Sequence, residues 1–211
     1  MKIINANFEI VDRLDGNDIL KKIERCGRVC YKSEDKITNE SAKKFVTFII
    51  EHGHESVLEH VSFTVKFIVD RGISHEIVRH RIASYSQEST RYCNYKNNNE
   101  IIVIEPCFWN ETEPPYGEEK AHYNAWKKSC EIAESTYLKM IEHGALPQEA
   151  RSVLPNSLKT EVIMTANLRE WRHFFRLRTA KNAHPQMREV ACSLLKAIKN
   201  IIPIVFNNIQ V

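Results

Sequence analysis

The segment from Arg79 to Tyr92 gathers side chains that can hold an anion. It contains three arginines, one histidine and three serines, and few of its residues are apolar. Arginine presents a forked pair of N–H donors and serine a short hydrogen bond, so the combination suits a phosphate. The alternative is a solvated surface on which Glu76 pairs with Arg79 and His80 along one helix. Spacing by itself leaves both interpretations open.

The geometry expected for this segment favours a ligand or a partner for at least one arginine. If Ser74 caps a short helix, Arg79, His80 and Arg81 lie on its last turn. Successive helical residues turn by about 100°, so Arg79 and Arg81 would point about 200° apart. One solvated face then cannot hold both, and one of them must meet an anion, a carboxylate or a partner chain. Beyond Arg81, an extended chain would align the odd-numbered residues from 87 to 91 on one face.

The glycines exclude two common ways of binding a nucleotide. The six glycines form neither a G-x-G-x-x-G nor a G-x-x-x-x-G-K pattern. The sequence therefore predicts neither a Rossmann turn nor a P-loop. Any phosphate must be held by side chains, such as those of the arginine-rich segment.

Four parts of the chain resemble one enzyme family. Arg79-His80-Arg81, followed by Ser84, Ser89, Arg91 and Tyr92, resembles the signature of the flavin-dependent thymidylate synthases. Three further segments are similar to other parts of that family, namely His52–His60, Ala150–Pro155 and Asn167–Gln186. The similarity covers roughly residues 5 to 200.

Two positions depart from the family pattern. Many relatives read Glu-Gln where this chain reads Gln87-Glu88, so the acid is displaced by one residue. Which of the two takes the part of that acid is open. Many relatives also carry Gln where this chain has Glu76, and a carboxylate there accepts a hydrogen bond from a uracil but cannot donate one.

The resemblance implies an enzyme that converts dUMP to dTMP, with methylenetetrahydrofolate as carbon donor and NADPH as reductant, on bound FAD. It also implies a homotetramer with active sites shared between chains. The implied dUMP-binding residues are Glu76, Ile77, Val78, Arg79, Gln87, Glu88, Ser89, Thr90, Arg91, Arg151 and Arg178. The implied FAD-binding residues are Ser56, Arg79, His80, Arg81, Gln87, Asn167, Leu168, Arg169 and His173.

Arg178 is the expected catalytic residue, because the resemblance places it beside the uracil base. A fixed guanidinium there stabilises negative charge on the ring and lets N3 ionise more easily. Without the resemblance, Arg178 is explained by the favourable position of a cation at a helix C-terminus.

Other functions make different predictions. An RNA-binding regulator could use the same arginines on phosphates, but the net charge of +3 is small and no RRM motif is visible. A flavoprotein oxidase would reduce FAD without transferring carbon. We predict no metal site at His52, His54 and His60, because their spacing is not H-E-x-x-H. Cys93 follows Arg91-Tyr92, and a nearby arginine could activate its thiol, yet it has no identifiable catalytic partner.

Composition places the chain among ordinary globular proteins. It has 211 residues, 43% hydrophobic and 27% charged, which predicts a single domain over residues 1–211. The six cysteines form no CxxC pair, and no apolar run approaches the ~20 residues of a membrane span. We therefore expect reduced thiols, a cytoplasmic location and no membrane contact.

The periodicity predicts an α+β fold with a mixed or antiparallel sheet flanked by helices, and a long central helix. Predicted strands span residues 3–11, 61–69, 101–104 and 160–166. Predicted helices span residues 18–26, 41–50, 123–140, 171–178 and 187–201. Residues 93–100 read as a loop and 110–119 as a turn region. Trp171, Phe174 and Phe175 are expected in the core.

Overall fold

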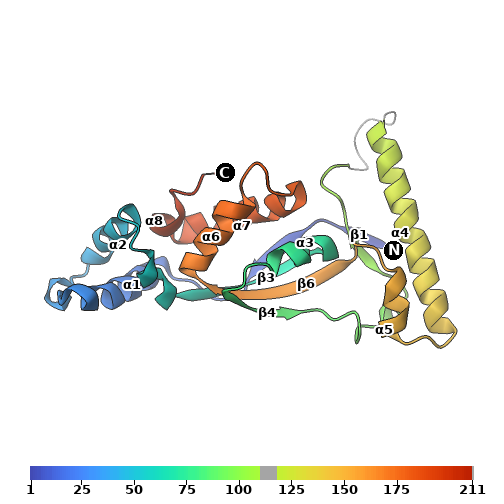
Figure 1. The fold of residues 1–211 in the computed structure, drawn as a ribbon, viewed down its shortest axis with the longest axis horizontal. Helices are drawn as coiled ribbons and strands as arrows, with labels where there is room; N and C mark the ends of the chain where they lie inside the picture. Colours follow the sequence, from blue (N-terminus) through green and yellow to red (C-terminus); the bar gives the residue numbers. More distant parts are fainter. Residues whose placement is uncertain (110–117, 211) are drawn as a thin grey trace. The chain divides into compact units, whose positions relative to one another are not determined.

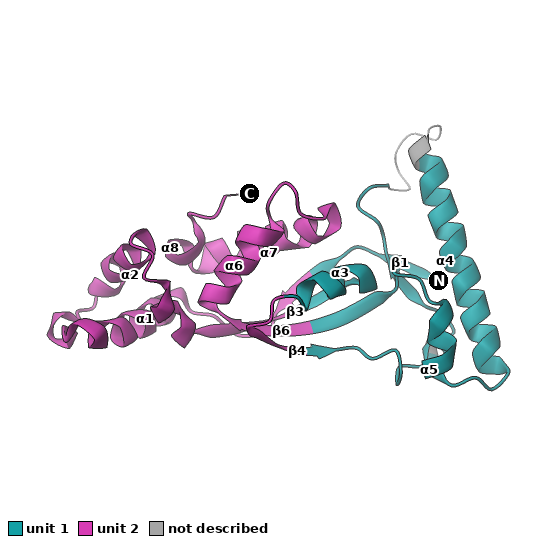
Figure 2. Cartoon of the chain, in the orientation of Figure 1, with its two compact units in different colours: residues 1–7, 67–79, 86–162 teal, residues 8–66, 80–85, 163–211 magenta. Residues whose placement is uncertain are grey.

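The computed structural model describes residues 1–109 and 118–210 (Figure 1). Helices and strands do not alternate regularly, and the predicted α+β class is confirmed. The chain forms two compact units (Figure 2), of which unit 1 comprises residues 1–7, 67–79 and 86–162, and unit 2 comprises residues 8–66, 80–85 and 163–211. The prediction of one domain is not tested by this division. Most of the predicted turn region, residues 110–117, lies outside the described residues.

Within the described residues the strands form two sheets. The four-stranded sheet has the order β2 (Asn7–Ile10), β3 (Ser62–Asp70), β6 (Lys159–Asn167) and β4 (Ala83–Gln87). The two-stranded sheet pairs β1 (Lys2–Ile4) with β5 (Ile102–Ile104) in parallel, with Ile3 opposite Val103. The prediction of one strand over residues 3–11 was therefore wrong. The chain breaks at Asn5 and Ala6, and its two halves join different sheets.

The strand predicted over residues 61–69 is confirmed as β3. Its buried residues alternate as the sequence indicates, with Phe63, Val65, Phe67 and Val69 almost fully buried. The predicted strand at 160–166 is likewise confirmed as β6, which shows the same alternation. In both strands this periodicity places the apolar side chains on one face of the sheet.

Unit 2 contains most of the helices. They are α1 (Gly16–Tyr31), the short 3₁₀ helix η1 (Glu34–Lys36), α2 (Ser41–Glu51), the 3₁₀ helix η2 (Glu55–His60), α6 (Leu168–Arg178), α7 (Pro185–Ile201) and α8 (Pro203–Phe206). α1 is longer than predicted, because Asp15 caps it by accepting from the N–H groups of Asn17 and Asp18. It ends where Lys32 adopts a left-handed conformation.

Aromatic side chains of α6 build the core of unit 2. Trp171 stacks on Phe63 with ring centroids 4.7 Å apart, and its indole N–H donates to the Phe63 carbonyl. Phe174 and Phe175 contact Trp171 and are fully buried. Their predicted place in the core is confirmed. Burying both the ring and its polar N–H in this way is favourable because the N–H keeps a partner.

Unit 1 holds the long predicted helix. It is α4 (Glu118–Glu142), and the chain leaves it through Gly144 at φ +92°. The other elements of this unit are α3 (Arg71–Ile77), η3 (Tyr95–Asn98), α5 (Pro147–Ala150) and η4 (Arg151–Val153). Cys130 of α4 packs with Ile101, Val103 and Leu158. Burial raises the pKa of the Cys130 thiol to about 11, so this cysteine is an apolar core residue.

The start of α3 corrects the expected geometry of the arginine-rich segment. Asp70, and not Ser74, caps the helix, since its Oδ1 accepts from the N–H of Ile73 at 2.7 Å. The helix therefore begins earlier and ends at Ile77, so Arg79 and Arg81 lie beyond it. The prediction that these two arginines diverge on one helical turn was wrong.

Among the residues that the structure describes, no helix combines the length and the apolar character needed to cross a membrane.

Candidate active site

His80 is the centre of a buried polar chain in unit 2. In the sequence it follows α3 and precedes β4, and it is only 3% exposed. Its Nδ1 is 2.9 Å from Oε1 of Glu170, and its Nε2 is 3.1 Å from Nε of Arg178. An arginine N–H can only donate, so Nε2 accepts, and Nδ1 carries the proton and donates to Glu170. His80 is therefore a neutral imidazole with both ring nitrogens engaged.

The surroundings of the ring hold it in this state. Burial lowers the pKa of His80, Arg178 acts in the same direction, and Glu170 opposes them without reversing the shift. Tyr85 of β4 donates its hydroxyl to the His80 carbonyl at 2.7 Å, and burial raises the pKa of that hydroxyl to about 12. The rings of His173 and Phe174 flank the imidazole at 5.5 and 4.9 Å.

His80, Glu170 and His173 also have the spacing of metal ligands. Their ligand atoms lie within 4.8 Å of one another. The hydrogen-bond directions favour another use, since Nε2 of His80 faces the guanidinium of Arg178, whose charge repels a cation. Two of the three histidines at positions 52, 54 and 60 make hydrogen bonds within the fold. Nδ1 of His54 bonds to the Tyr31 hydroxyl, and Nδ1 of His52 bonds to the Phe48 carbonyl.

A pocket of about 530 Å³ in unit 2 brings three predicted flavin residues together. Its lining residues are Glu55, Glu59, Ile82, Asn167, Arg169, Glu170, His173 and Arg176. Arg169 is ion-paired with Glu59 at 2.6 Å. Ser56 is exposed on η2, between two residues that line the pocket. Leu168 is not among the lining residues: its side chain is fully buried, and its N–H donates to the Val61 carbonyl.

A pocket of about 540 Å³ in unit 1 differs from the unit 2 pocket in the charge of its lining. Its lining residues are Arg71, His75, Thr90, Gln148, Arg151, Ser152, Leu154, Pro155, Asn156 and Leu158, none of which is acidic. Nη1 of Arg151 donates to the hydroxyl of Thr90 at 3.2 Å, so two predicted substrate residues meet here. Two guanidinium groups without a carboxylate on the wall favour an anionic ligand.

Gln87 and Glu88 have different surroundings at the end of β4. The amide of Gln87 donates to the hydroxyls of Ser74 at 3.0 Å and Thr160 at 3.3 Å. Both carboxylate oxygens of Glu88 are engaged, one by the Tyr95 hydroxyl at 3.2 Å and the other by Lys159 at 3.0 Å. Glu88 thus contributes to the fold of unit 1.

The chain turns after Glu88 and does not run extended. The N–H groups of Tyr92 and Cys93 donate to the Ser89 carbonyl, which closes a turn. The guanidinium of Arg91 lies over the ring of Tyr92, 5.4 Å from its centroid. The predicted common face of residues 87, 89 and 91 was therefore wrong, because the strand ends at Gln87.

The predicted site residues are divided between the units. Unit 1 holds residues 76–79, 87–91 and 151, and unit 2 holds Arg178 together with residues 56, 80, 81, 167–169 and 173. Ile77 of α3 is fully buried, whereas Arg79, Arg81 and Arg91 are exposed. The binding roles of all these residues stay predictions.

Sequence reasoning did not identify Glu170, Arg71, His75 or Tyr85 as site residues. Asn167 caps α6 by accepting from the N–H of Glu170, a spacing that the sequence displays. That spacing places Glu170 in the first turn of a helix. Its contact with His80, a residue far away in the sequence, has no local signal.

The described residues form an α+β protein with an acid-free pocket in unit 1, a second pocket in unit 2 and a chain of hydrogen bonds that joins a buried carboxylate and imidazole to a guanidinium. Residues 9–204 match the family described as Thymidylate synthase complementing protein. The flavin-dependent thymidylate synthase of Geobacter sulfurreducens is 35% identical over 188 residues, which cover 86% of this chain and 78% of that protein.

The flavin-dependent thymidylate synthase of Pyrococcus furiosus is 38% identical over 168 residues, which cover 78% of this chain and 66% of that protein. The chain therefore belongs to the flavin-dependent thymidylate synthase family, a family of enzymes, as the resemblance indicated. The fold is similar to that of the UMP/dUMP methylase PolB from Streptomyces cacaoi, solved with 5-Br dUMP, with a TM-score of 0.79 and 21% identity over 98% of this chain and 96% of that chain.

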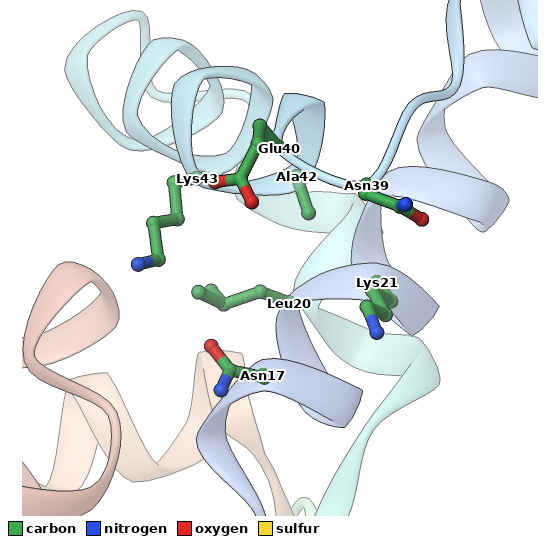
Figure 3. A pocket seen from close by; sticks show the side chains of 7 residues that line it. All are labelled: Asn17, Leu20, Lys21, Asn39, Glu40, Ala42 and Lys43. Carbon is green, nitrogen blue, oxygen red and sulfur yellow. The ribbon is translucent and has the colours of Figure 1, made fainter.

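A further pocket of about 320 Å³ lies apart from the predicted residues. It is formed by α1, α2 and the residues just before α2 (Figure 3), and its lining residues are Asn17, Leu20, Lys21, Asn39, Glu40, Ala42 and Lys43. No predicted site residue lines it.

Proposed function

We propose that this protein converts dUMP to dTMP by reductive methylation, with methylenetetrahydrofolate as carbon donor, NADPH as reductant and FAD as the flavin. The observation that carries the proposal is the match of residues 9–204 to the family. We also propose the homotetramer with shared active sites and the cytoplasmic location that family membership implies.

The acid-free pocket of unit 1 supports the substrate part of the proposal. dUMP carries a phosphate of about two negative charges, for which forked guanidinium donors are the preferred partners. Arg151 and Thr90 of this pocket belong to the predicted substrate set, and Arg71 adds a second guanidinium. Arg71 and His75 lie four positions apart on α3, so one helix face presents both to the phosphate.

The pocket of unit 2 supports the flavin part. Asn167, Arg169 and His173 offer amide, guanidinium and imidazole groups that can hydrogen-bond to a flavin ring or its phosphates, and exposed Ile82 offers apolar surface to a planar ring. These residues fit FAD and would hold it. Bound FAD would supply the redox chemistry, while the protein supplies position and electrostatics.

The proposed role of Arg178 follows from its chemistry. A guanidinium group acts as a fixed positive charge and not as a base. Placed beside the uracil, that charge stabilises the ring ionised at N3 and makes carbon 5 more nucleophilic without a cysteine adduct. The electrostatic term is strongest where the guanidinium is held still before the reaction.

An anaerobic absorption experiment tests the function. FAD is added to the purified protein, followed by NADPH, and then by dUMP and methylenetetrahydrofolate in turn. The proposal expects a bound flavin that bleaches with NADPH and reoxidises only when both substrates are present. A flavin that stays reduced with both substrates and reoxidises only after oxygen is admitted would indicate an oxidase, and RNA binding that falls steeply with salt, without bound flavin, would indicate a regulator.

The exchanged order of Gln87 and Glu88, relative to the family pattern, gives a second test. Because both oxygens of Glu88 have partners within unit 1, we assign the substrate contact at this place to Gln87. Glu88→Gln is expected to lower the free energy of unfolding by about 1–3 kcal/mol, since it removes a charged partner of half-buried Lys159. Gln87→Ala is expected to raise the KM for dUMP about two- to tenfold through loss of one hydrogen bond. The reverse pattern, a raised KM for Glu88→Gln with unchanged stability, would return the substrate role to Glu88.

A further inference from the structure

Arg178 is held by a chain of two buried side chains. Glu170 and Arg178 both belong to α6 and lie eight positions apart, about 12 Å along the helix axis. The imidazole of His80, which comes from a distant segment, bridges them with contacts of 2.9 and 3.1 Å. Glu170 and His80 are 7% and 3% exposed, so the contact between these two side chains is shielded from water.

The donors and acceptors along this chain of side chains determine which ring nitrogen of His80 carries the proton. Glu170 accepts the proton of Nδ1, and this contact selects the tautomer in which Nε2 has a lone pair. Only that tautomer can accept the Nε–H of Arg178. In the other tautomer Nε2–H would face Nε–H, and two donors without an acceptor between them repel.

Each member of the chain is itself anchored. Asn167 accepts from the backbone N–H of Glu170 at 2.9 Å, which fixes the first turn of α6. Tyr85 holds the backbone of His80 through the carbonyl, and Phe174 packs against the ring. A planar guanidinium that is held at Nε has its plane, and therefore the direction of both Nη groups, restricted.

We propose that Glu170 and His80 are positioning residues that orient the guanidinium of Arg178: the carboxylate selects the imidazole tautomer, and the imidazole holds Nε. This inference rests on the proposed function, which gives Arg178 its role beside the uracil. It assigns a part to Glu170 and gives His80 a part other than direct contact with the flavin.

The charged and titratable groups around the His80 ring determine how turnover should depend on pH. They are Glu170, His173 and Arg178 of α6 and Tyr85 of β4. Protonation of His80 turns Nε2 into a donor and breaks the contact with Arg178. Turnover of the wild-type enzyme should therefore fall as the pH drops through the lowered pKa of His80.

The test compares Glu170→Ala and Glu170→Gln with Glu9→Gln, a control in which an exposed carboxylate paired with Lys66 is changed in the same way. For each variant, kcat and the KM for dUMP, the bound flavin, the free energy of unfolding and the ¹⁵N NMR signals of His80 are measured. We expect Glu170→Ala to lower kcat about 10- to 100-fold, the usual cost of losing a buried orienting partner, with a much smaller change in KM. Glu170→Gln should recover part of kcat, because its amide oxygen can still accept from Nδ1–H.

The NMR signals decide the tautomer without any need for activity. The wild type should show a protonated Nδ1 and an unprotonated Nε2, and Glu170→Ala should shift the population toward protonated Nε2. A protonated Nε2 in the wild type, an unchanged kcat in Glu170→Ala, or equal losses of flavin and stability in both Glu170 variants would overturn the proposal. If the wild type makes no dTMP, the proposed function fails, and the NMR result still tests the hydrogen-bond chain by itself.

Discussion

Arg178→Ala is expected to lower the kcat for dTMP formation by about 10²–10³-fold, the usual effect of removing one preorganised electrostatic donor. The flavin should stay bound, because the residues predicted to hold it lie on other turns of α6, on η2, at the end of β6, and before and at the end of β4. Steady-state kinetics and the visible spectrum of the variant measure the two effects separately.

Arg178→Lys should recover little of this loss. A lysine ammonium is a compact point charge without the planar fork, so its N–H donors to His80 and to a ring are not held in one fixed plane. Arg25→Ala is the matched control, since Arg25 is exposed on α1 and has no proposed role. Turnover of Arg178→Ala close to that of the wild type would remove Arg178 from the mechanism.

Glu55→Ala is expected to cost about 3–5 kcal/mol of unfolding free energy, because it leaves a buried guanidinium without its counter-charge. Arg172 is fully buried, and its Nη2 lies 3.0 Å from Oε1 of Glu55. Its Nη1 donates to the Val205 carbonyl and to the side chain of Asn208, so the same guanidinium ties α6 to the C-terminal segment. Urea unfolding at equal m-values measures the loss.

The control for Glu55 is another ion pair of unit 2. Arg169 and Glu59 also make a short contact, but their side chains are 52% and 45% exposed, so Glu59→Ala should cost no more than about 1 kcal/mol. Similar losses for the two variants would show that burial of Arg172 does not determine the effect.

The pH dependence of Glu55 gives the sign of a second measurement. Burial acts to raise its pKa, but the hydrogen bond from Arg176 and the charge of Arg172 outweigh burial and hold the pKa below its ordinary value. Its stabilising contribution is therefore present above the unfolded-state pKa and lost as the pH falls through the folded-state pKa. The difference in stability between the wild type and Glu55→Ala should shrink as the solution is acidified through that range.

Local patterns of the sequence were enough to determine several features. The alternation in β3 and the apolar spacing of α7 involve residues two to four positions apart, and such spacings fix which face of an element is buried. The order of residues from Arg79 to Tyr92 was likewise enough to indicate the family.

The tertiary structure decided what depends on distant parts of the chain. Whether Asp70 or Ser74 caps α3 depends on where β3 ends, and β1 and β2 separate because they find different partner strands. The partners of the two carboxylate oxygens of Glu88 are Tyr95 and Lys159, and Lys159 comes from a distant part of the chain. The contact between Glu170 and His80 forms only when folding brings distant segments together, and only the packed interior sets the burial that makes such a contact strong.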